Sequence, residues 1–333
     1  LASGKNPSLE KKRATVAASV GATNTFAAVA EELIGKRERE GLKDVTTEKA
    51  RWLLSLLADD VGRRPIAEIE PFELLAALKK VEASGRLETA KRLHAFAGRV
   101  FRYAVATTRA RRNVAADLQG ALVAPKVKHH AAIIEPKAVG ELLRAIDAFS
   151  GMPTTAWALR LAPHVFLRPG ELRQAEWSEI DLDAAIWRIP ASRMKMKREH
   201  VVPLSTQAQA ILKEAKAITG RGRYVFPGLA TPNRPLSENT LNKALRRLGY
   251  GPEQMTSHGF RSTASTLLNE SGKWSPDAIE RALAHGDSDG VRAAYHRGAH
   301  WAERVQMAQW WSDYLDRLRR EGEVIPLKPA LRR

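Results

Sequence analysis

The sequence predicts a mainly α-helical protein, in which an all-α bundle is followed by a mixed, mostly helical domain with a small antiparallel sheet. Apolar residues recur at three- and four-residue spacing through most of the chain, which is the period of an amphipathic helix. The one good strand signal is the pair of runs IWRIP (186–190) and HVVPL (200–204), which is typical of a hairpin. The chain has 333 residues, 44% of them hydrophobic, which suits about two domains with a real core.

The first part of the chain contains four helical patterns and no strand signal. Residues 1–21 are polar and basic without a clear period, and we interpret them as a linker or the end of a missing domain. The bundle is assigned to residues 22–120. Its third helix begins at Pro71, a residue suited to the first helical position, and its fourth runs from about Leu87 to Ala106. The first two helices are marked by the apolar positions Phe26, Val29, Ala30 and Leu33, and Ala50, Leu53, Leu54 and Leu57.

A basic segment separates this bundle from the second domain. We assign residues 121–131 to the interdomain linker and residues 132–333 to the second domain. Five cations on or just before this linker are opposed only by Asp117: Arg109, Arg111, Arg112, Lys126 and Lys128. In the second domain, three serines mark helix starts: Ser205, Ser237 before the apolar positions from Leu241, and Ser275, which a proline follows.

The charge of the chain points to a polyanionic partner. Lys and Arg total 54 against 37 Asp and Glu, which gives a formal charge of +17. Nucleic acid fits this charge better than a membrane does, because no basic amphipathic helix with a bulky apolar face dominates the sequence. No apolar run approaches the length of about 18 residues that a bilayer span needs, and the start lacks a signal-peptide core. We therefore expect a soluble, intracellular protein, and a fragment of a longer one.

Several kinds of chemistry are excluded by missing residue types or motifs. Without cysteine the chain has no disulfide, no thiolate metal site and no cysteine nucleophile. It contains no phosphate loop, no G-x-G-x-x-G fingerprint, no H-E-x-x-H motif and no G-x-S-x-G elbow. His285, His296 and His300 could converge on a metal, but hydrogen-bonding surface histidines are the favoured interpretation. We expect neither a metal nor a cofactor.

Five short pieces in a fixed order carry the chemistry of the second domain. They contribute Arg168 with Glu171, Lys195, His258 with Arg261, His285, and Tyr295. Each piece alone has an ordinary structural explanation, such as a surface ion pair, a solvated basic hairpin or a core tyrosine. Together they are typical of a phosphate site with a nucleophile, because guanidinium groups match phosphate oxygens bidentately and a lysine can protonate a departing oxygen. A tyrosine can attack once a base or positive surroundings activate its phenol.

At these residues the chain resembles the tyrosine recombinases, in the phage-integrase branch of prophages and genomic islands. The resemblance runs from about Asn24 to the WWSDYLDRL stretch near 310–318. Its most specific parts are LRPGELRQAEWSEIDL, RMKMKREHVVPLS, HGFRSTASTLLNE and IERALAHGDSDGVRAAYHR. It implies a core-binding domain at 22–120, a catalytic domain at 132–333 and a missing N-terminal arm-binding domain.

The resemblance also implies a role for each residue of the pattern. The scissile phosphate would be clamped by Arg168 and Arg261, with Glu171 in support, and His258 and His285 would assist proton transfer and phosphate binding. Tyr295 would form a 3′-phosphotyrosyl bond and release a 5′-hydroxyl. The family's spacing places the general acid eight residues before Pro203, at Lys195 rather than Lys197. The 3′-phosphotyrosyl bond would conserve the energy of the phosphoester, so the resemblance implies that no ATP is needed.

The partners that the resemblance implies are double-stranded DNA attachment sites and three further copies of the chain. We expect a homotetramer on DNA, a monomer or weak oligomer without it, and a bacterial cytoplasmic location; a DNA-bending accessory protein stays an open partner. The linker cations named above, and Arg193, Lys197 and Arg198 of the hairpin, are expected to contact the DNA backbone. Whether the helical tail near 301–318 packs on its own subunit or on a neighbour is left open.

The sequence departs from the usual pattern of this family at three places. Val165 and Phe166 stand where Thr-Gly is frequent, Phe260 replaces a common Leu, and Ala284 replaces a Gly before the histidine. None of these changes removes a reactive side chain, so we expect an active enzyme. The alternatives are a catalytically silent DNA-binding protein of architectural or regulatory function on the same scaffold, or a type IB topoisomerase.

Overall fold

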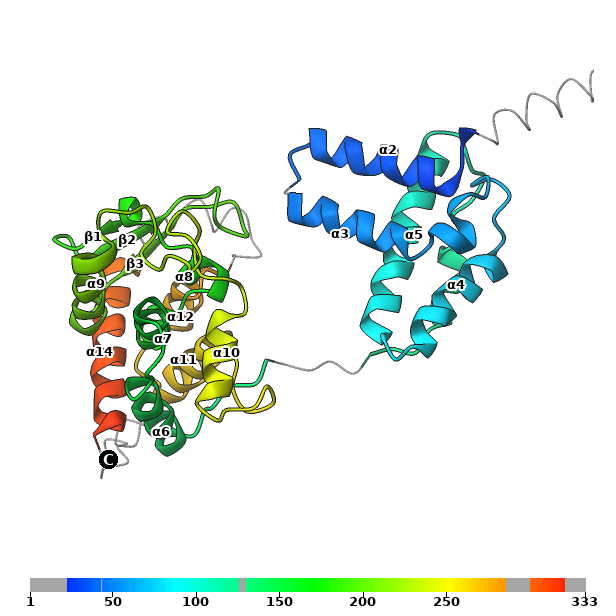
Figure 1. Cartoon of the computed structure of the whole chain (residues 1–333). Helices are drawn as coiled ribbons and strands as arrows, with labels where there is room; N and C mark the ends of the chain where they lie inside the picture. Colours follow the sequence, from blue (N-terminus) through cyan, green and yellow to red (C-terminus); the bar gives the residue numbers. More distant parts are fainter. Residues whose placement is uncertain (1–22, 43, 126–129, 286–299, 321–333) are drawn as a thin grey trace, which may run out of the picture. The chain divides into compact units, whose positions relative to one another are not determined.

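The computed structural model describes residues 23–42, 44–125, 130–285 and 300–320 (Figure 1). The chain divides into two compact units, Leu1–Lys128 and His129–Arg333, and the division falls inside the segment 121–131 that the sequence assigns to a linker. Within the described ranges, no helix is long and apolar enough to cross a membrane.

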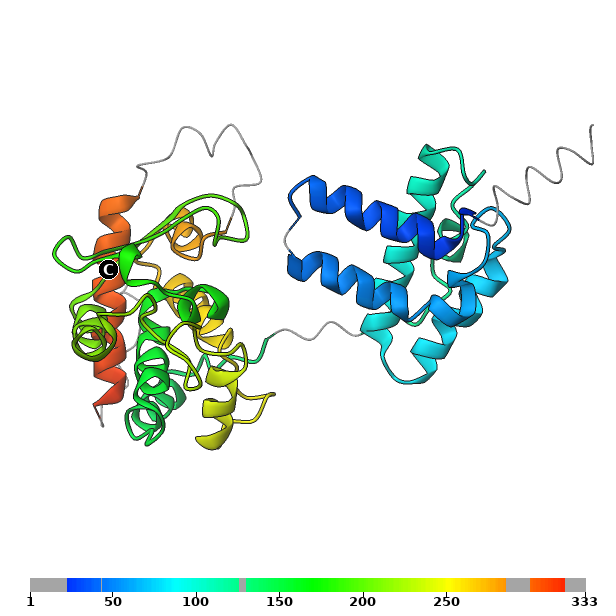
Figure 2. The same cartoon turned by 45° about the horizontal axis from the view of Figure 1, so that its top comes forward.

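The first unit is entirely helical over its described residues. Its α-helices are α2 (Phe26–Arg39), α3 (Asp44–Ser55), α4 (Pro71–Ala83) and α5 (Leu87–Ala106), and the short turns are η1 (Ala58–Gly62) and η2 (Ala116–Leu118). Helices α2 and α3 lie side by side in both views (Figures 1 and 2). Thr25 caps α2 by accepting the amide of Ala28 at 3.2 Å, and Pro71 begins α4 as the sequence predicts. The four predicted helices are confirmed, whereas the π-helical turn η1 was not predicted.

The second unit is mostly helical. Its helices are α6 (Pro136–Asp147), α7 (Pro153–Val165), α8 (Pro169–Arg173), η3 (Trp177–Glu179), α9 (Thr206–Thr219), α10 (Thr240–Arg247), α11 (Gly259–Ser271), α12 (Pro276–Ala282) and α14 (Trp301–Arg319). Two of the three predicted helix starts are confirmed: the hydroxyl of Ser205 accepts the amide of Ala208 at 3.2 Å, and that of Ser275 accepts the amide of Ala278 at 3.3 Å. The third, at Ser237, is wrong, because α10 begins at Thr240 with Asn239 as its N-cap residue.

A small antiparallel sheet completes the second unit. Its strands are β1 (Ile180–Asp181), β2 (Ile186–Ile189) and β3 (His200–Pro203), in the order β1-β2-β3, and Ile189 pairs with His200. The predicted hairpin is therefore confirmed as β2 and β3, but the sheet has a third strand. The sequence missed β1 because two residues are too few to show alternation.

The loop between β2 and β3 is not extended. Residues 190–199 form turns, and Lys197 has the left-handed φ of 51°. Lys195 and Lys197 therefore do not share a strand face, as an extended hairpin arm would have required.

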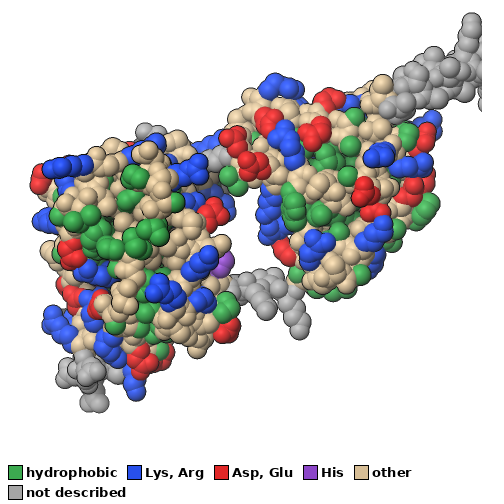
Figure 3. Space-filling model, in the orientation of Figure 1, with side chains coloured by type: hydrophobic (Ala, Val, Ile, Leu, Met, Phe, Trp, Pro, Cys, Tyr) green, Lys and Arg blue, Asp and Glu red, His purple; other side chains and the backbone are tan. Residues whose placement is uncertain are grey.

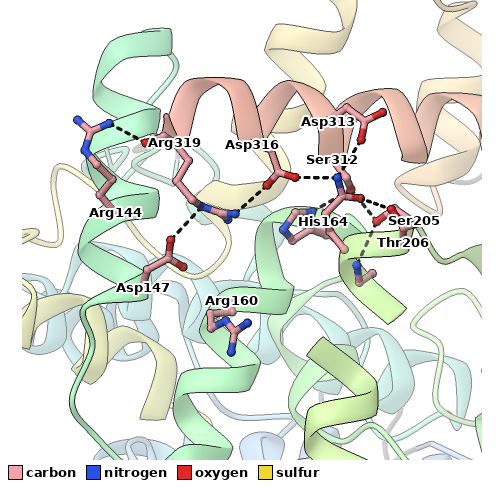
Figure 4. Close-up of polar contacts among 12 residues, drawn as sticks. Arg144, Asp147, Arg160, His164, Ser205, Thr206, Ser312, Asp313, Asp316 and Arg319 are labelled. Carbon is pink, nitrogen blue, oxygen red and sulfur yellow. Dashed lines mark hydrogen bonds and ion pairs between the residues drawn. The ribbon is translucent and has the colours of Figure 1, made fainter. Parts of the chain in front are cut away.

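Helix α14 packs on its own unit, which answers the question that the sequence left open for residues 301–319. It runs beside α9 in Figures 1 and 2 and buries Trp311, Tyr314 and Leu315 among α6, α11 and α12. Polar contacts fix it further (Figure 4): Arg319 pairs with Asp147 at 3.0 Å and with Asp316 at 2.7 Å.

A buried hydrogen-bond chain lies under the same helix. Nδ1 of His164 lies 2.9 Å from Oγ of Ser312, which donates to Oγ of Ser205 at 2.7 Å (Figure 4). Burial, with Arg319 and Arg160 nearby, lowers the pKa of His164 to about 3, so this ring is neutral near pH 7.

Candidate active site

The reactive residues of the second unit come from the ends of three helices and from one loop. Arg168 is the N-cap residue of α8, His258 is the N-cap residue of α11, and Arg261 lies in the first turn of α11. His285 follows the C-terminal end of α12. The two arginines meet because both reach the backbone at the end of α12.

Arg261 is buried and is held by backbone carbonyls. It is 4% exposed, and its guanidinium donates to the carbonyl oxygens of Phe166 and of Leu283, the latter at 2.6 Å. Its Nη2 also lies 3.1 Å from Nε2 of His285. Burial and the nearby charge of Arg168 lower the pKa of Arg261 to about 10, which leaves it protonated at neutral pH. Because carbonyls carry no formal charge, the positive charge stays available to an anion.

Arg168 is held by one carboxylate and one carbonyl. Its Nη1 donates to Oε1 of Glu171 at 2.9 Å, and its Nη2 donates to the carbonyl oxygen of Ala284 at 3.2 Å. The second carboxylate oxygen of Glu171 accepts the amide of Arg168 at 2.9 Å, so this buried acid fixes both the backbone and the side chain. Glu171 therefore holds both the backbone and the guanidinium of Arg168 in place.

Two left-handed residues present carbonyls to these arginines. Phe166 has a φ of 55° and Ala284 a φ of 50°, and both lie at places where the sequence departs from the pattern of the family that it resembles. The carbonyl of Phe166 binds Arg261 and that of Ala284 binds Arg168. A non-glycine residue in this conformation costs about 1–2 kcal/mol. Phe166 offsets part of that cost by burying its ring 6.1 Å from the ring of Trp311.

Of the two histidines of the pattern, His285 contacts Arg261 and His258 contacts His130. Oε2 of Glu280 lies 2.6 Å from Nδ1 of His285, which fits a ring that donates to Glu280 and accepts from Arg261. The ring of His258 lies 4.4 Å from that of His130. Burial, then His130 and Arg261, lower the pKa of His258 to about 4, so its ring is neutral near pH 7.

Gly259 lets the chain pass close beside these side chains. A Cβ atom at this position would lie 2.3 Å from the carbonyl oxygen of Ala131, nearer than such atoms can approach. The same carbonyl accepts the amide of Thr256 at 3.2 Å. The glycine of the HGFR stretch therefore lets the segment at 131 pack against the start of α11.

The predicted general acid, Lys195, has no contact with the two arginines in the described part of the chain, and the predicted nucleophile lies outside that part. Lys195 is exposed in the loop between β2 and β3, as are Lys197 and Arg198. Tyr295 lies outside the described residues, as do Lys126, Lys128 and His296. Among the residues that the structure describes, no group of three His, Asp or Glu could hold a metal ion.

Two residues predicted to contact DNA, Arg193 and Arg109, have internal partners in the structure. Arg193 pairs with the buried Glu179 and donates to the carbonyl oxygen of Glu171 at 2.7 Å. Arg109 donates to both oxygens of Glu32, at 2.6 and 3.0 Å, and these contacts with Arg109 and Tyr103 lower the pKa of Glu32 to about 2. The charge of each arginine is thus balanced by a carboxylate, which composition alone did not reveal.

The remaining linker arginines of the described part are exposed. Arg111 and Arg112 both lie at the surface, and Arg112 reaches Glu70 at 3.4 Å and Asp117 at 3.3 Å. Surface pairs of this length contribute little, so Arg112 can exchange its partners for a phosphate.

The sequence analysis missed two buried residues beside the site, His200 and Arg304. They are 7% and 9% exposed. His200 had a signal that we did not use: in the strand HVVP it shares a face with the buried Val202. Arg304 also had a signal: it lies three, four and seven residues before Met307, Ala308 and Trp311, and therefore on the same buried face of α14.

Two arginines on carbonyl supports, with two histidines nearby, form a cluster whose chemistry suits a phosphate, in a mostly helical unit. A model of the phage integrase central domain matches residues 26–121, and a model of the phage integrase family matches residues 133–300. The chain therefore belongs to the phage integrase family of tyrosine recombinases, with a central core-binding domain and a catalytic domain.

Among particular relatives, the chain is similar to the putative protein IntB of Escherichia coli (strain K12), at 41% identity over 348 residues, covering 99% of this chain and 86% of that protein. It is also 39% identical over 330 residues to the integrase of Enterobacteria phage P4, covering 95% of this chain and 74% of the relative.

Solved structures share the fold. A lambda integrase tetramer bound to a Holliday junction matches with a TM-score of 0.67 and 18% identity, over 87% of this chain and 84% of that one. A lambda integrase dimer bound to a COC' core site matches with a TM-score of 0.66 and 20% identity, over 90% of this chain and 84% of the other.

Proposed function

We propose that this protein cuts and rejoins double-stranded DNA at attachment sites, in the bacterial cytoplasm, and thereby integrates a prophage or genomic island. The observation that carries the proposal is the convergence of Arg168 and Arg261 on the end of α12, where their supports are mainly uncharged carbonyls. Such a pair can stabilise negative charge on the nonbridging oxygens of a phosphodiester under attack.

The proposed reaction is a transesterification. The phenolic oxygen of Tyr295 bonds to the scissile phosphorus as the bond from phosphorus to the 5′ oxygen breaks. Lys195 gives a proton to the departing 5′ oxygen, and the neutral His258 accepts the phenolic proton. A 5′-hydroxyl of a partner strand then reverses the same steps and releases the tyrosine. Each step exchanges one phosphoester for another, so neither ATP nor a metal enters the balance.

The assembly we propose is a homotetramer on DNA. The tetrameric lambda integrase on a Holliday junction shares this fold, and a strand exchange between two duplexes needs four active sites. An accessory protein that bends the DNA would assist the assembly. Binding would rest on phosphate neutralisation, so log affinity should fall linearly with log salt, by about 0.9 for each phosphate contact on duplex DNA. An affinity for duplex DNA that does not change with salt would refute this mode of binding.

The direct test is covalent trapping. Incubation of the chain with a nicked attachment-site duplex should give a denaturation-resistant protein–DNA adduct, which Tyr295→Phe abolishes while keeping DNA affinity. Tyr250→Phe is the matched control and should keep the adduct. If the unaltered chain binds the site and forms no adduct, the silent DNA-binding alternative is correct. Efficient relaxation of a supercoiled plasmid without an attachment site would favour a topoisomerase.

A second test separates Lys195 from its neighbour. An alkoxide leaves poorly, whereas a thiol with a pKa near 8.5 leaves without protonation. Lys195→Ala should therefore cripple cleavage of ordinary DNA and be largely rescued when sulfur replaces the bridging 5′ oxygen. Lys197→Ala should cost much less and show no selective rescue. Rescue of Lys197→Ala alone would transfer the general-acid role to that residue.

A further inference from the structure

The loop between β2 and β3 has a held half and an exposed half. The backbone of the held half turns on itself, since the amide of Arg193 donates to the carbonyl oxygen of Pro190 at 3.0 Å. Met194 is 2% exposed and packs in the core of the second unit. Residues 195–199 are all exposed. Lys195 is therefore the first residue beyond the held half, and Arg193 and Met194 set the point from which it projects.

Arg193 fastens the held half to two other elements. Its side chain is 14% exposed, its Nη1 pairs with the carboxylate of Glu179 in η3, and its Nη2 donates to the backbone carbonyl oxygen of Glu171 in α8 at 2.7 Å. The carboxylate of Glu179 also accepts from Nε1 of the buried Trp187 in β2 at 3.0 Å. A lysine would balance the charge of Glu179, but the planar fork of an arginine is needed to reach a carboxylate and a carbonyl of different elements at once. The contact with Glu171 is thus the one that requires arginine.

The residue that accepts from Arg193 is also the one that holds Arg168. The carboxylate of Glu171 accepts from the amide and from Nη1 of Arg168, both at 2.9 Å, while the carbonyl of Glu171 accepts from Arg193. Glu171 is 5% exposed, so little water competes for these contacts. The base of the loop that carries Lys195 is therefore joined, through one residue, to an arginine of the proposed phosphate clamp.

We propose that Arg193 is a positioning residue for the general acid, which fixes the base of the β2–β3 loop relative to Arg168 so that Lys195 projects from a set place. The side chain of Lys195 is long and flexible, so the place of its Cα atom decides how often its ammonium group meets the leaving oxygen. Loss of the link to Glu171 lets the loop base shift, which slows protonation of the departing 5′ oxygen, while the carboxylate contacts that hold Arg168 remain. The inference rests on the proposed roles of Lys195 as general acid and of Arg168 in phosphate binding.

The test uses the different needs of two leaving groups in the full chain. Arg193→Lys keeps a cation beside the buried Glu179 and removes the reach to the carbonyl of Glu171. Since a misplacement of about 1 Å can cost about 100-fold, the single-turnover rate of adduct formation on a nicked attachment-site duplex should fall about 10- to 100-fold. With sulfur in place of the bridging 5′ oxygen the leaving thiol needs no proton, so the rate should return to within about threefold of the unaltered chain. Arg188→Lys, the same change at an exposed residue of β2, is the matched control and should stay within about threefold on both substrates.

Two double variants test the path from Arg193 to Lys195. Lys195→Ala combined with Arg193→Lys should be within about twofold of Lys195→Ala alone, because a residue that acts only through another adds nothing once that residue is gone. Arg193→Gln combined with Glu179→Gln leaves no buried charge unpaired, and the amide oxygen at position 179 still accepts from Trp187. This second variant should show the same rescue by sulfur, with thermal unfolding as the check of its fold, and it replaces Arg193→Lys if that variant does not fold.

Several results would overturn the proposal. An unchanged rate of Arg193→Lys on ordinary DNA would show that its pair with Glu179 is only structural. Equal losses on ordinary and sulfur-containing DNA would show that Arg193 does not act through Lys195, as would a further loss when Arg193→Lys is added to Lys195→Ala. In each of these cases the proposed function stands, because the unaltered chain still forms the adduct. No adduct from the unaltered chain on either substrate would instead refute the proposed function, and this inference with it.

Discussion

The two units of the chain hold their basic side chains in different ways. In the first unit arginines and lysines pair with carboxylates at the surface, as Arg51 does with Glu38 at 2.7 Å and Arg109 with Glu32 at 2.6 Å. In the second unit three partly or wholly buried arginines, Arg168, Arg261 and Arg304, reach backbone carbonyl oxygens. Of these three, only Arg168 also has a carboxylate hydrogen-bond partner among the described residues.

This difference shows why a large net charge does not locate a phosphate site. The formal charge is +17, yet basic and acidic side chains are interspersed on the visible face of each unit (Figure 3). A carboxylate partner cancels the charge of a cation, whereas a carbonyl orients the cation and leaves its charge uncancelled. The second arrangement is the one that a phosphate needs.

The largest expected effect concerns Arg193, which lies in the second unit but pairs with a carboxylate, as the arginines of the first unit do. Arg193 is paired with Glu179, whose side chain is 6% exposed. Arg193→Ala should lower the free energy of unfolding by about 3–5 kcal/mol, because it leaves a buried carboxylate unpaired. The exposed Arg198, in the same loop, is the control, and Arg198→Ala should stay within about 0.5 kcal/mol. Urea unfolding measures both. If Arg193→Ala instead keeps full stability and loses DNA affinity, Arg193 contacts DNA after all.

The next effect tests whether carbonyl support is what matters at the site. Arg261→Lys keeps the charge but cannot reach the carbonyls of Phe166 and Leu283 and a phosphate together. We expect the rate of adduct formation to fall at least about 100-fold, in line with the loss of one preorganised donor group. Arg109→Lys, in the first unit, should change the rate less than about threefold, because its partner is a surface carboxylate. Similar losses in the two variants would remove the distinction between the units.

The pH dependence of stability should belong to the second unit. The folded state lowers the pKa of His164 and His200 to about 3, from 6.5. Their stabilisation is therefore complete above the unfolded pKa of 6.5 and is lost as the pH falls toward 3, because the unfolded chain binds more protons. Between pH 7 and 5.5 each histidine should cost about 1 kcal/mol.

Hydrogen exchange at the two pH values measures this loss unit by unit. Exchange should quicken in the second unit and not in the first. His164→Gln should remove about a third of the dependence, because His258, whose pKa is lowered to about 4, contributes beside His164 and His200. Equal acceleration in both units would contradict the assignment.

The smallest effect concerns backbone conformation. Ala284 has a φ of 50°, so Ala284→Gly should stabilise the protein by about 0.5 kcal/mol, read as a rise in Tm. Gly85 of the first unit has a φ of +78°, and a Cβ added there would meet no atom within 4 Å, so Gly85→Ala should cost about 1 kcal/mol through backbone strain alone. A loss of stability in Ala284→Gly would mean that its methyl group packs better than its conformation costs.

Much of this protein follows from its sequence alone. The apolar periodicity fixed the four helices of the first unit, with α5 at Leu87–Ala106 as predicted, and the alternation in IWRIP and HVVPL marked strands β2 and β3. The order of the five reactive pieces led to the family, because that order is specific even though each piece is not. The spacing of apolar side chains and the order of motifs can be read directly from the sequence, so these predictions need no structure.

Only the tertiary structure decided how the reactive groups are supported. Nothing in the sequence marks Phe166, Leu283 and Ala284 as the carbonyls that hold Arg261 and Arg168, or links Arg304 to β3. Nor did composition reveal that Arg193 and Arg109 are engaged by carboxylates. The physical reason is that every residue carries the same carbonyl group, so its role as an acceptor depends on where the fold places it and not on which side chain it bears.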